Sequence, residues 1–395
     1  MRVAVVGFGA SGLYLSSLLK ESGIEFTVFE KKERLGGNIY PTKIGKDYID
    51  LGFQVFNPKF YPLVTGFLKK LGLEFEQTDM SFGIETFVAK EKFNWGSSWE
   101  SIVKSLLVNR PLTRSLLFFI KLVANLTRWQ KGSNHTPCNL VENLFIKPLA
   151  YTLWSVDKNL SCPDYEYVLS FLRNHEMLNL LKRTKWHTIK GSTKAYLEAV
   201  VNLIDPKNIR DGTEVHSITK SNGKLRISTS RGPEVFDCLF FAIEQDFLYD
   251  LLIGSDLTIA SKLREIEKPL SSESSIYVHK NFSSLPEISG AWNFVQKDSQ
   301  TFSIVYDLRI LQKKNYLVSL NDGTVSSECL YQTVLRHPIV GKRNQTFVEA
   351  LKKFQGVENV YFCGSFFGYG FHEDAFKSAQ EAFDLFKCSI RRKFI

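Results

Sequence analysis

Apolar and polar positions at the start of the chain alternate in blocks that predict a strand, a helix and a second strand. Residues 2–6 (RVAVV) form a short, mostly apolar run that predicts a buried strand. Residues 13–23 (LYLSSLLKESG) have the periodicity of a helix that ends at Gly23, and residues 24–30 (IEFTVFE) predict a strand that ends at Glu30. This alternation is typical of an α/β fold.

The middle of the chain follows a different pattern. Residues 63–190 are rich in helix-like apolar periodicity, and the α/β pattern returns after Gly191. The returning segments are a helix over 192–204, a hairpin over 212–230 that turns at Asn222-Gly223, buried strands over 235–243 and 357–364, and a final helix from about Ala375. Because each pattern interrupts the other, the sequence predicts two interleaved domains.

We expect residues 1–62, 191–249 and 346–395 to form a nucleotide-binding domain. Residues 63–190 and 250–345 would fill the two insertions and form a substrate-binding domain of mixed sheet and helix. The length of 395 residues suits about two domains, and a chain of this size can build its core without disulfides or metals.

Composition narrows the partner and the compartment. The six cysteines are scattered without a C-x-x-C pair, which argues against a zinc knuckle or a disulfide scaffold and fits a reducing compartment. The net charge of +9 favours an anionic partner, and because no basic-aromatic alternation recurs, we expect no nucleic-acid binding. No signal peptide and no apolar run of about 20 residues is visible, so we expect a cytoplasmic protein.

A glycine motif follows the first predicted strand. Gly7, Gly9 and Gly12 have the spacing G-x-G-x-x-G: the first permits a tight turn, the second lets a pyrophosphate approach the backbone, and the third lets helix and strand pack closely. Glu30 stands 18 residues after Gly12, where a carboxylate can accept hydrogen bonds from the adenosine ribose hydroxyls. The motif predicts a dinucleotide site; the alternative is a glycine turn without a ligand.

A second motif, Glu33-Arg34-Leu35-Gly36-Gly37-Asn38, follows the second strand directly. It resembles the R-x-G-G element of the FAD-dependent amine-oxidase and phytoene-desaturase clan, in which this element passes close to the FAD pyrophosphate and ribityl chain. The alternative is an ordinary surface turn. No second G-x-G-x-x-G appears, so the sequence favours FAD over a separate NAD domain.

Longer stretches extend this resemblance over nearly the whole chain. They are similar to a branch of predicted NAD/FAD-binding oxidoreductases that accompany cyclopropane-fatty-acid-type methyltransferases. The resemblance implies a Rossmann-like FAD-binding domain of the amine-oxidase type, interleaved with a second mixed sheet-and-helix domain. This chain departs from the branch at Gly191-Ser192, Lys194 and Glu244, which puts the substrate in question more than the FAD. The matching stretches are 48–72, 78–84, 153–157, 171–197, 290–294, 335–339 and 362–382.

The two motifs and the resemblance together define the expected cofactor contacts. The resemblance implies that Val215 contacts the adenine through its backbone and that the turn from Gly364 to Gly370 aims the N-terminus of the last helix at the flavin. From the residues alone, Val215 is simply a strand residue of the core. The expected cofactor-binding residues are Gly7, Gly9, Ala10, Ser11, Gly12, Glu30, Lys31, Gly36, Gly37, Asn38, Val215, Gly364, Ser365, Gly370, Phe371 and His372.

His372 and Glu373 are the candidate catalytic residues. They stand with Asp374 at the start of the last predicted helix, where His372 could orient the flavin or substrate or move a proton. The alternative is that the two carboxylates cap the helix. Trp154, Trp186 and Trp292 are candidates for the substrate pocket, although tryptophans at such places also serve as core. We expect no metal, because no ligands have metal-like spacing.

The segment 110–129 suggests a further contact, with the inner face of a membrane. Arg114, Lys121, Asn125 and Arg128 fall at spacings of 7, 4 and 3, in one stripe of a helix. Such a helix would lie in a membrane interface with its basic stripe near phosphates, or it would pack into the substrate domain. Its apolar positions are Leu116, Leu117, Phe118, Phe119, Ile120, Leu122, Val123 and Leu126.

The resemblance implies hydride transfer between an apolar substrate, such as the acyl chain of a lipid, and N5 of the flavin, giving desaturation or double-bond reduction. Two alternatives within the clan are an amine- or porphyrinogen-type oxidase and a non-redox flavin isomerase. A third, of another class, is a non-catalytic FAD-binding partner of a lipid methyltransferase.

Overall fold

The computed structural model describes residues 1–88, 90–154, 165–178, 184–298, 301–322, 325, 328–339 and 341–393. Residues 155–157 and 179–183, which belong to two of the stretches behind the family resemblance, lie outside the described residues.

A five-stranded parallel sheet forms one half of the molecule. The first predicted strand is β1 (Val3–Val6), which pairs with β2 (Phe26–Phe29) on one side and with β13 (Cys238–Phe241) on the other. The edge strands are β19 (Val360–Phe362) and β9 (Ile209–Arg210), which gives the order β19-β13-β1-β2-β9. Parallel strands need cover on both faces, and this requirement explains their continuous apolar runs.

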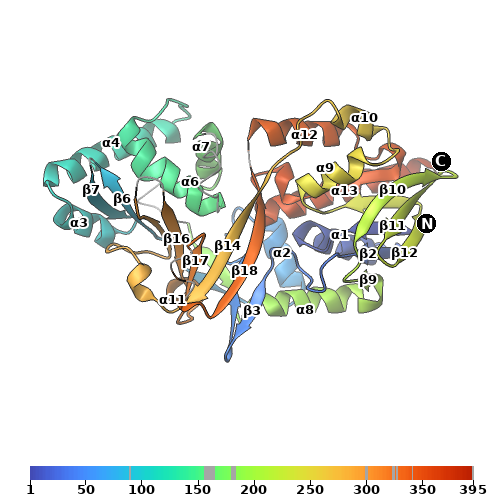
Figure 1. Cartoon of the computed structure of the whole chain (residues 1–395), viewed down its shortest axis with the longest axis horizontal. Helices are drawn as coiled ribbons and strands as arrows, with labels where there is room; N and C mark the ends of the chain where they lie inside the picture. Colours follow the sequence, from blue (N-terminus) through green and yellow to red (C-terminus); the bar gives the residue numbers. More distant parts are fainter. Residues whose placement is uncertain are drawn as a thin grey trace.

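Different elements cover the two faces of this sheet. Because side chains alternate across a strand, Val3 and Val5 pack in one apolar cluster with residues of α1, α8 and the C-terminal helix α13. Figure 1 shows these three helices on the right. Ala4 and Val6 face a second apolar cluster with the three-stranded antiparallel sheet β10-β11-β12 and helices α9, α10 and α12. The bounds are α1 (Ala10–Glu21), α8 (Thr193–Ile204), α9 (Gln245–Ile253), α10 (Ile259–Leu263), α12 (Lys342–Lys353), α13 (His372–Lys393), β10 (Val215–Ser221), β11 (Lys224–Thr229) and β12 (Gly232–Phe236).

A seven-stranded sheet forms the other half. Its order is β18-β14-β17-β16-β15-β6-β7, and β15 and β6 are its one parallel pair among the described strands. The strands β6 (Phe82–Val88) and β7 (Glu91–Gly96) come from a region for which the sequence predicted mainly helix-like periodicity. They are strands because β6 pairs with the distant β15 (Trp292–Gln296), a tertiary contact that overrides the local pattern. The remaining strands are β14 (Ser271–His279), β16 (Phe302–Asp307), β17 (Leu317–Leu320) and β18 (Tyr331–Pro338).

Helices cover one side of this second sheet, at the left of Figure 1. Their shared apolar cluster includes Trp95 of β7, Phe118 and Trp129 of α4, and Trp154 at the end of α6. The helices are α3 (Trp99–Val108), α4 (Leu112–Gln130), α5 (Asn139–Val141), a π-helical turn over Glu142–Ile146, α6 (Lys147–Trp154) and α7 (Tyr165–Asn174). Within the described part of the chain, no helix combines the length and the apolar content that crossing a membrane requires.

Short elements connect the two halves. A hairpin joins β3 (Pro41–Ile44) to β4 (Asp47–Asp50), and two distant segments, β5 (Phe75–Thr78) and β8 (Trp186–Ile189), pair as a two-stranded antiparallel sheet. The short helices are α2 (Pro62–Lys70) and α11 (Leu308–Leu311), and 3-10 turns span Pro206–Asn208, Phe282–Ser284, Val357–Asn359 and Ser365–Phe367.

Asp50 joins three of these elements. Its buried carboxylate accepts hydrogen bonds from the backbone amide and the hydroxyl of Thr193, at 2.9 and 2.6 Å, where α8 begins. The side-chain amide of Gln312 binds the backbone of Asp50 on both its N–H and its C=O. Burial raises the pKa of the Asp50 carboxyl to about 7, above the 3.8 of an ordinary aspartate, because a charge is disfavoured away from water.

This pKa predicts how stability depends on pH. Between about pH 4 and pH 7 the native chain keeps a proton that the unfolded chain has released, so the free energy of unfolding decreases as the pH rises. Asp50→Asn removes this titration. Urea unfolding at pH 5 and pH 8 should show the wild type losing about 2–3 kcal/mol more than the variant over this interval. If the free energy of unfolding depends on pH equally in the wild type and the variant, the raised pKa of Asp50 is contradicted.

Candidate functional site

A cavity of about 560 Å³ lies where the two halves meet. One wall is formed by the loops that follow β1, β2, β13 and β19, at the carboxyl ends of the parallel strands. The opposite wall comes from strands β14 to β18 of the second sheet. Ligands of open parallel sheets bind at the carboxyl ends of the strands, so the position alone marks a ligand site.

Two glycine loops form the floor of the cavity. A Cβ on Gly12 would lie 2.0 Å from the carbonyl oxygen of Gly7, so the helix can approach β1 only with glycine there. Gly37 has a positive φ of 58°, and a Cβ on it would lie 3.0 Å from the Cα of Gly9. The loops after β1 and β2 therefore meet backbone to backbone.

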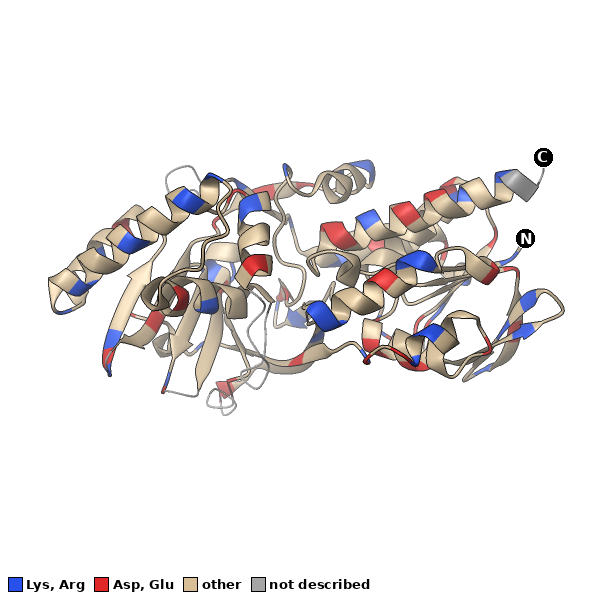
Figure 2. Ribbon diagram, turned by 90° about the horizontal axis from the view of Figure 1, so that it is seen from above, with Lys and Arg blue, Asp and Glu red and all other residues tan. Residues whose placement is uncertain are grey.

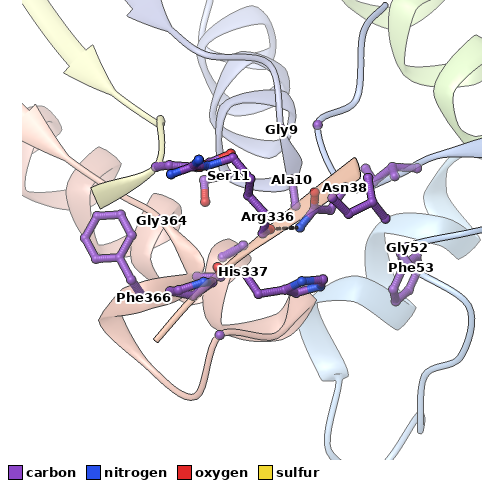
Figure 3. A pocket seen from close by; sticks show the side chains of 18 of the residues that line it. Gly9, Ala10, Ser11, Asn38, Gly52, Phe53, Arg336, His337, Gly364 and Phe366 are labelled. Atoms are coloured by element: carbon purple, nitrogen blue, oxygen red, sulfur yellow. Dashed lines mark hydrogen bonds and ion pairs between the residues drawn. The ribbon is translucent and has the colours of Figure 1, made fainter. Parts of the chain in front are cut away.

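The N-terminus of α1 opens onto this floor. Gly9 caps the helix without a side-chain hydrogen bond, and Gly9, Ala10 and Ser11 all line the cavity (Figure 3). The first amides of a helix have no partner within it and carry the positive end of its dipole. This arrangement suits a diphosphate.

Glu30 lies at the edge of the cavity, as the spacing predicted. Its two carboxylate oxygens accept hydrogen bonds from the amides of Phe8 and Lys32, at 2.9 and 3.0 Å, and so tie the glycine loop to the end of β2. Carboxylate oxygens hold further lone pairs that ribose hydroxyls could use. Lys31 also lines the cavity, 3.9 Å from Glu214 and over the ring of Phe247.

Arg34 of the second motif stabilises the motif's own turn by hydrogen bonds. The guanidinium of Arg34 donates to the carbonyls of Leu35, Gly37 and Ile39, and lies over the ring of Tyr40. Arg34 therefore shapes the turn and is not among the residues that line the cavity. Asn38 does line it, and its side-chain amide donates to the carbonyl of Arg336, at 2.7 Å (Figure 3).

Most of the remaining expected cofactor contacts reach the same cavity. Val215, Gly364, Ser365, Gly370, Phe371 and His372 line it, whereas Gly12 and Gly36 lie behind the floor. Arg336 and His337, at the end of β18, also line it, although neither was among the expected site residues. The only feature of the sequence that pointed to them was that they lie in the 335–339 stretch, which resembles the family. Arg336 forms ion pairs with Glu244, Asp246 and Glu273.

His372 is a neutral imidazole. It stacks on Phe53, with 4.0 Å between ring centroids, and its Nε2 lies 3.2 Å from the hydroxyl of Tyr196. Burial lowers the pKa of His372 to about 3. The ring is therefore positioned by Phe53 and Tyr196 and carries no charge near neutral pH.

The two acidic neighbours of His372 point elsewhere. The Glu373 carboxylate accepts hydrogen bonds from the amides of Leu63 and Val64, at 3.1 and 3.0 Å, and so caps α2. Asp374 accepts from the amides of Tyr369 and Phe371, both at 3.0 Å, and fixes the glycine turn. Glu373 does not line the cavity, so the structure brings together only His372 of the two candidate catalytic residues.

The far end of the cavity is aromatic. Trp154, Trp186 and Trp292 all line it, together with Phe171 and Tyr306. The indole N–H of Trp154 donates to the carbonyl of Tyr369, at 2.8 Å, which fixes the ring. The buried indole N–H of Trp292 has no acceptor among the described residues and could donate to a ligand. Six of the charged residues that line the cavity belong to the nucleotide-side elements, and the seventh, Arg336 of β18, forms ion pairs with Glu244 and Asp246 of that side. The six are Glu30, Lys31, Lys32, Glu214, Glu244 and Asp250.

Comparisons with known proteins agree with this geometry. Residues 5–71 match the model of the NAD(P)-binding Rossmann-like domain family. A segment of 73 residues is 38% identical to human amine oxidase [flavin-containing] B, which covers 18% of this chain and 14% of that protein. The chain thus spans about a seventh of the length of this curated relative.

Solved structures match over the whole fold. A candidate protoporphyrinogen oxidase from Exiguobacterium sp. 255-15 superposes with a TM-score of 0.68 at 15% identity, covering 98% of this chain and 99% of that one. The CLA-producing fatty acid isomerase from P. acnes gives a TM-score of 0.63 at 14% identity, covering 100% and 99%. The predicted fold class, a Rossmann-like domain combined with a second mixed-sheet domain, is confirmed.

The contacts of Glu373 predict a structural defect in its variant. Glu373→Ala leaves the amides of Leu63 and Val64 without acceptors, and should reduce the free energy of unfolding by about 1–2 kcal/mol. Denaturant unfolding measures this change. Glu381→Ala, on the same helix without a described partner, serves as the control. A Glu373 variant with wild-type stability would contradict the capping role.

Proposed function

We propose that this protein is an FAD-dependent oxidoreductase that acts on an apolar substrate. One observation carries the proposal: a single cavity joins a floor suited to a dinucleotide with an aromatic end at which the described residues place no charged side chain. The flavin-containing relative and the matching folds support the same cofactor.

The residues present fit FAD. Glu30 would accept hydrogen bonds from the adenosine ribose, and the first amides of α1 would hold the pyrophosphate. Gly9 and Gly37 keep this path free of side chains. Gly370 and Phe371 would lie beside the ring, where the start of α13 offers the positive end of a helix dipole. When bound, FAD supplies hydride chemistry.

The aromatic end determines what else this chain does. Trp154, Trp186 and Trp292 would exclude water and orient a flat or extended apolar group. The neutral His372 would position this group and not protonate it. An aromatic pocket suits a carbon chain, and the full-length match to a fatty acid isomerase favours the same kind of substrate, so we infer desaturation or double-bond reduction of a fatty-acyl group.

A second candidate function is isomerisation of a double bond without net electron transfer. The full-length match to a fatty acid isomerase favours it specifically. Amine oxidation is a weaker proposal, since no carboxylate that could pair with an ammonium group lies at the aromatic end among the described residues. A non-catalytic role beside a lipid methyltransferase is also weaker, since the cavity extends beyond the dinucleotide floor to an aromatic end that could hold a substrate.

Cofactor binding is tested by the visible spectrum of the purified protein and by titration with FAD. Glu30→Ala should weaken FAD binding about 10- to 100-fold, because a charge-assisted acceptor is lost. Glu33→Ala, which removes an exposed carboxylate from the same turn, should bind FAD like the wild type. If neither the wild type nor FAD-reconstituted protein shows flavin bands, the proposal fails.

The reaction is tested anaerobically by adding vesicles of unsaturated phospholipid or free fatty acid to the FAD-bound protein. Bleaching of the flavin bands together with a product that has gained a double bond supports desaturation. A product with a shifted double bond, an unchanged number of double bonds and no lasting bleaching of the flavin bands supports the isomerase instead. Bleaching by amines alone would overturn the apolar-substrate assignment.

A further inference from the structure

Exposed apolar side chains concentrate on two consecutive helices. Of the 17 large hydrophobic residues that are exposed in the described chain, eight lie on α3 and α4, and 43–67% of each is accessible to solvent. Single exposed apolar residues are normal, but a cluster of this size is not. We call these eight residues the α3–α4 surface: Trp99, Val103, Leu107, Leu112, Leu116, Leu117, Ile120 and Val123.

Helical periodicity places these residues on the outer faces. In α3, Trp99, Val103 and Leu107 recur every four positions. In α4 the inner face is also apolar, so the sequence pattern could not say which side is covered. The two helices pack together, and the hydroxyl of Ser115 donates to the carbonyl of Ser105, at 3.2 Å. The buried residues of α4 are Ser115, Phe118, Leu122, Asn125, Leu126 and Trp129.

This finding corrects the expected composition of the 110–129 helix. Phe118, Leu122 and Leu126, which were counted with the apolar face that could meet a membrane, belong to the buried cluster of the second half, as in the alternative in which this helix packs into the substrate domain. Asn125 was expected in the basic stripe, but it is buried, and its side-chain carbonyl oxygen accepts a hydrogen bond from Nε2 of His135, at 2.8 Å. The exposed apolar face is consequently narrower on α4 and extends instead onto α3.

Basic residues border the α3–α4 surface. Residues 99–131 contain six Lys or Arg and one acidic residue, Glu100. Arg114, Lys121 and Arg128 recur every seven positions along α4. Figure 2 shows several Lys or Arg bands along the long helix at the left. Arg110, Lys121, Arg128 and Lys131 form no ion pair within the described part of the chain.

We propose that the α3–α4 surface docks on an anionic lipid bilayer. An apolar face bordered by Lys and Arg is the pattern of helices that lie in the membrane interface, where the apolar side chains enter the acyl boundary and the cations reach the phosphates. A second copy of this chain would bring equal positive charges together, and protein interfaces are depleted in Lys. Charge complementarity therefore selects the bilayer.

The docked face would lie on the outside of the aromatic end of the cavity. The inner face of α4 packs in the same apolar cluster as Trp154 and Phe171, which line that cavity. Membrane docking requires no bound flavin, so its test is separate from the test of the proposed function.

Vesicle co-sedimentation tests the docking. The wild type should bind vesicles of phosphatidylglycerol and phosphatidylcholine more tightly than vesicles of phosphatidylcholine alone. Leu117→Glu with Ile120→Glu should weaken this binding at least tenfold. Leu385→Glu is the matched control, because Leu385 is an equally exposed leucine on α13, 49% accessible against 48% for Leu117. It should bind like the wild type.

The charges are tested separately. Lys121→Gln with Arg128→Gln should weaken binding to the anionic vesicles roughly 10- to 30-fold, since each basic residue near an anionic surface contributes about 1 kcal/mol. Lys352→Gln with Lys353→Gln, which removes two exposed charges from α12, should leave this binding unchanged.

Trp emission should shift to shorter wavelength when vesicles are added, and most of this shift should be lost in Trp99→Phe.

Three results would overturn the docking. The first is a folded wild type that fails to bind anionic vesicles. The second is vesicle binding that is equally strong in the Leu117→Glu, Ile120→Glu variant and in the wild type. The third is a dimer in analytical ultracentrifugation that this variant converts to monomer while vesicles remain unbound, which would assign the face to a second copy. Circular dichroism of each variant verifies folding.

Discussion

The direct contact between the two glycine loops is the constraint on which the site depends. Gly37 and Gly9 meet backbone to backbone, so neither loop can move without opening the floor of the cavity. The carboxylate of Glu30 and the guanidinium of Arg34 hold the loops by binding backbone amides and carbonyls. With the loops held in this way, the first amides of α1 face the cavity and offer the positive end of the helix dipole to a diphosphate.

The turn into α13 connects this floor to the second half. Three consecutive residues serve three different elements: His372 contacts Phe53 and Tyr196, Glu373 caps α2, and Asp374 fixes the glycine turn. The orientation of the His372 ring is therefore set by its neighbours on every side, and burial prevents it from gaining a charge. The surface that His372 presents to the cavity is therefore uncharged near neutral pH, which suits apolar chemistry better than proton transfer by this residue.

The sequence predicted those features that are local requirements of the backbone. The spacing of Gly7, Gly9 and Gly12 and the acid at the end of β2 each follow from a turn that a dinucleotide needs, and the structure places them together. It could not predict that Glu373 caps α2, because the amides it binds lie about 310 positions away. The strand β6 was missed for the same reason, since its partner β15 lies far along the chain.

The helix α4 shows a further limit of periodicity. A helix that is apolar on two faces buries apolar surface on both sides. The sequence pattern predicts which residues form each face, but not which partner packs against it. The inner face is covered by the cluster that also supports Trp154. Lys and Arg side chains border the outer face, and water solvates their charged groups well. The exposed leucines of this face are apolar, so their contact with water is unfavourable. An anionic bilayer offers an apolar interior to the leucines and phosphates to the surrounding cations. Neither water nor a second positively charged chain offers both.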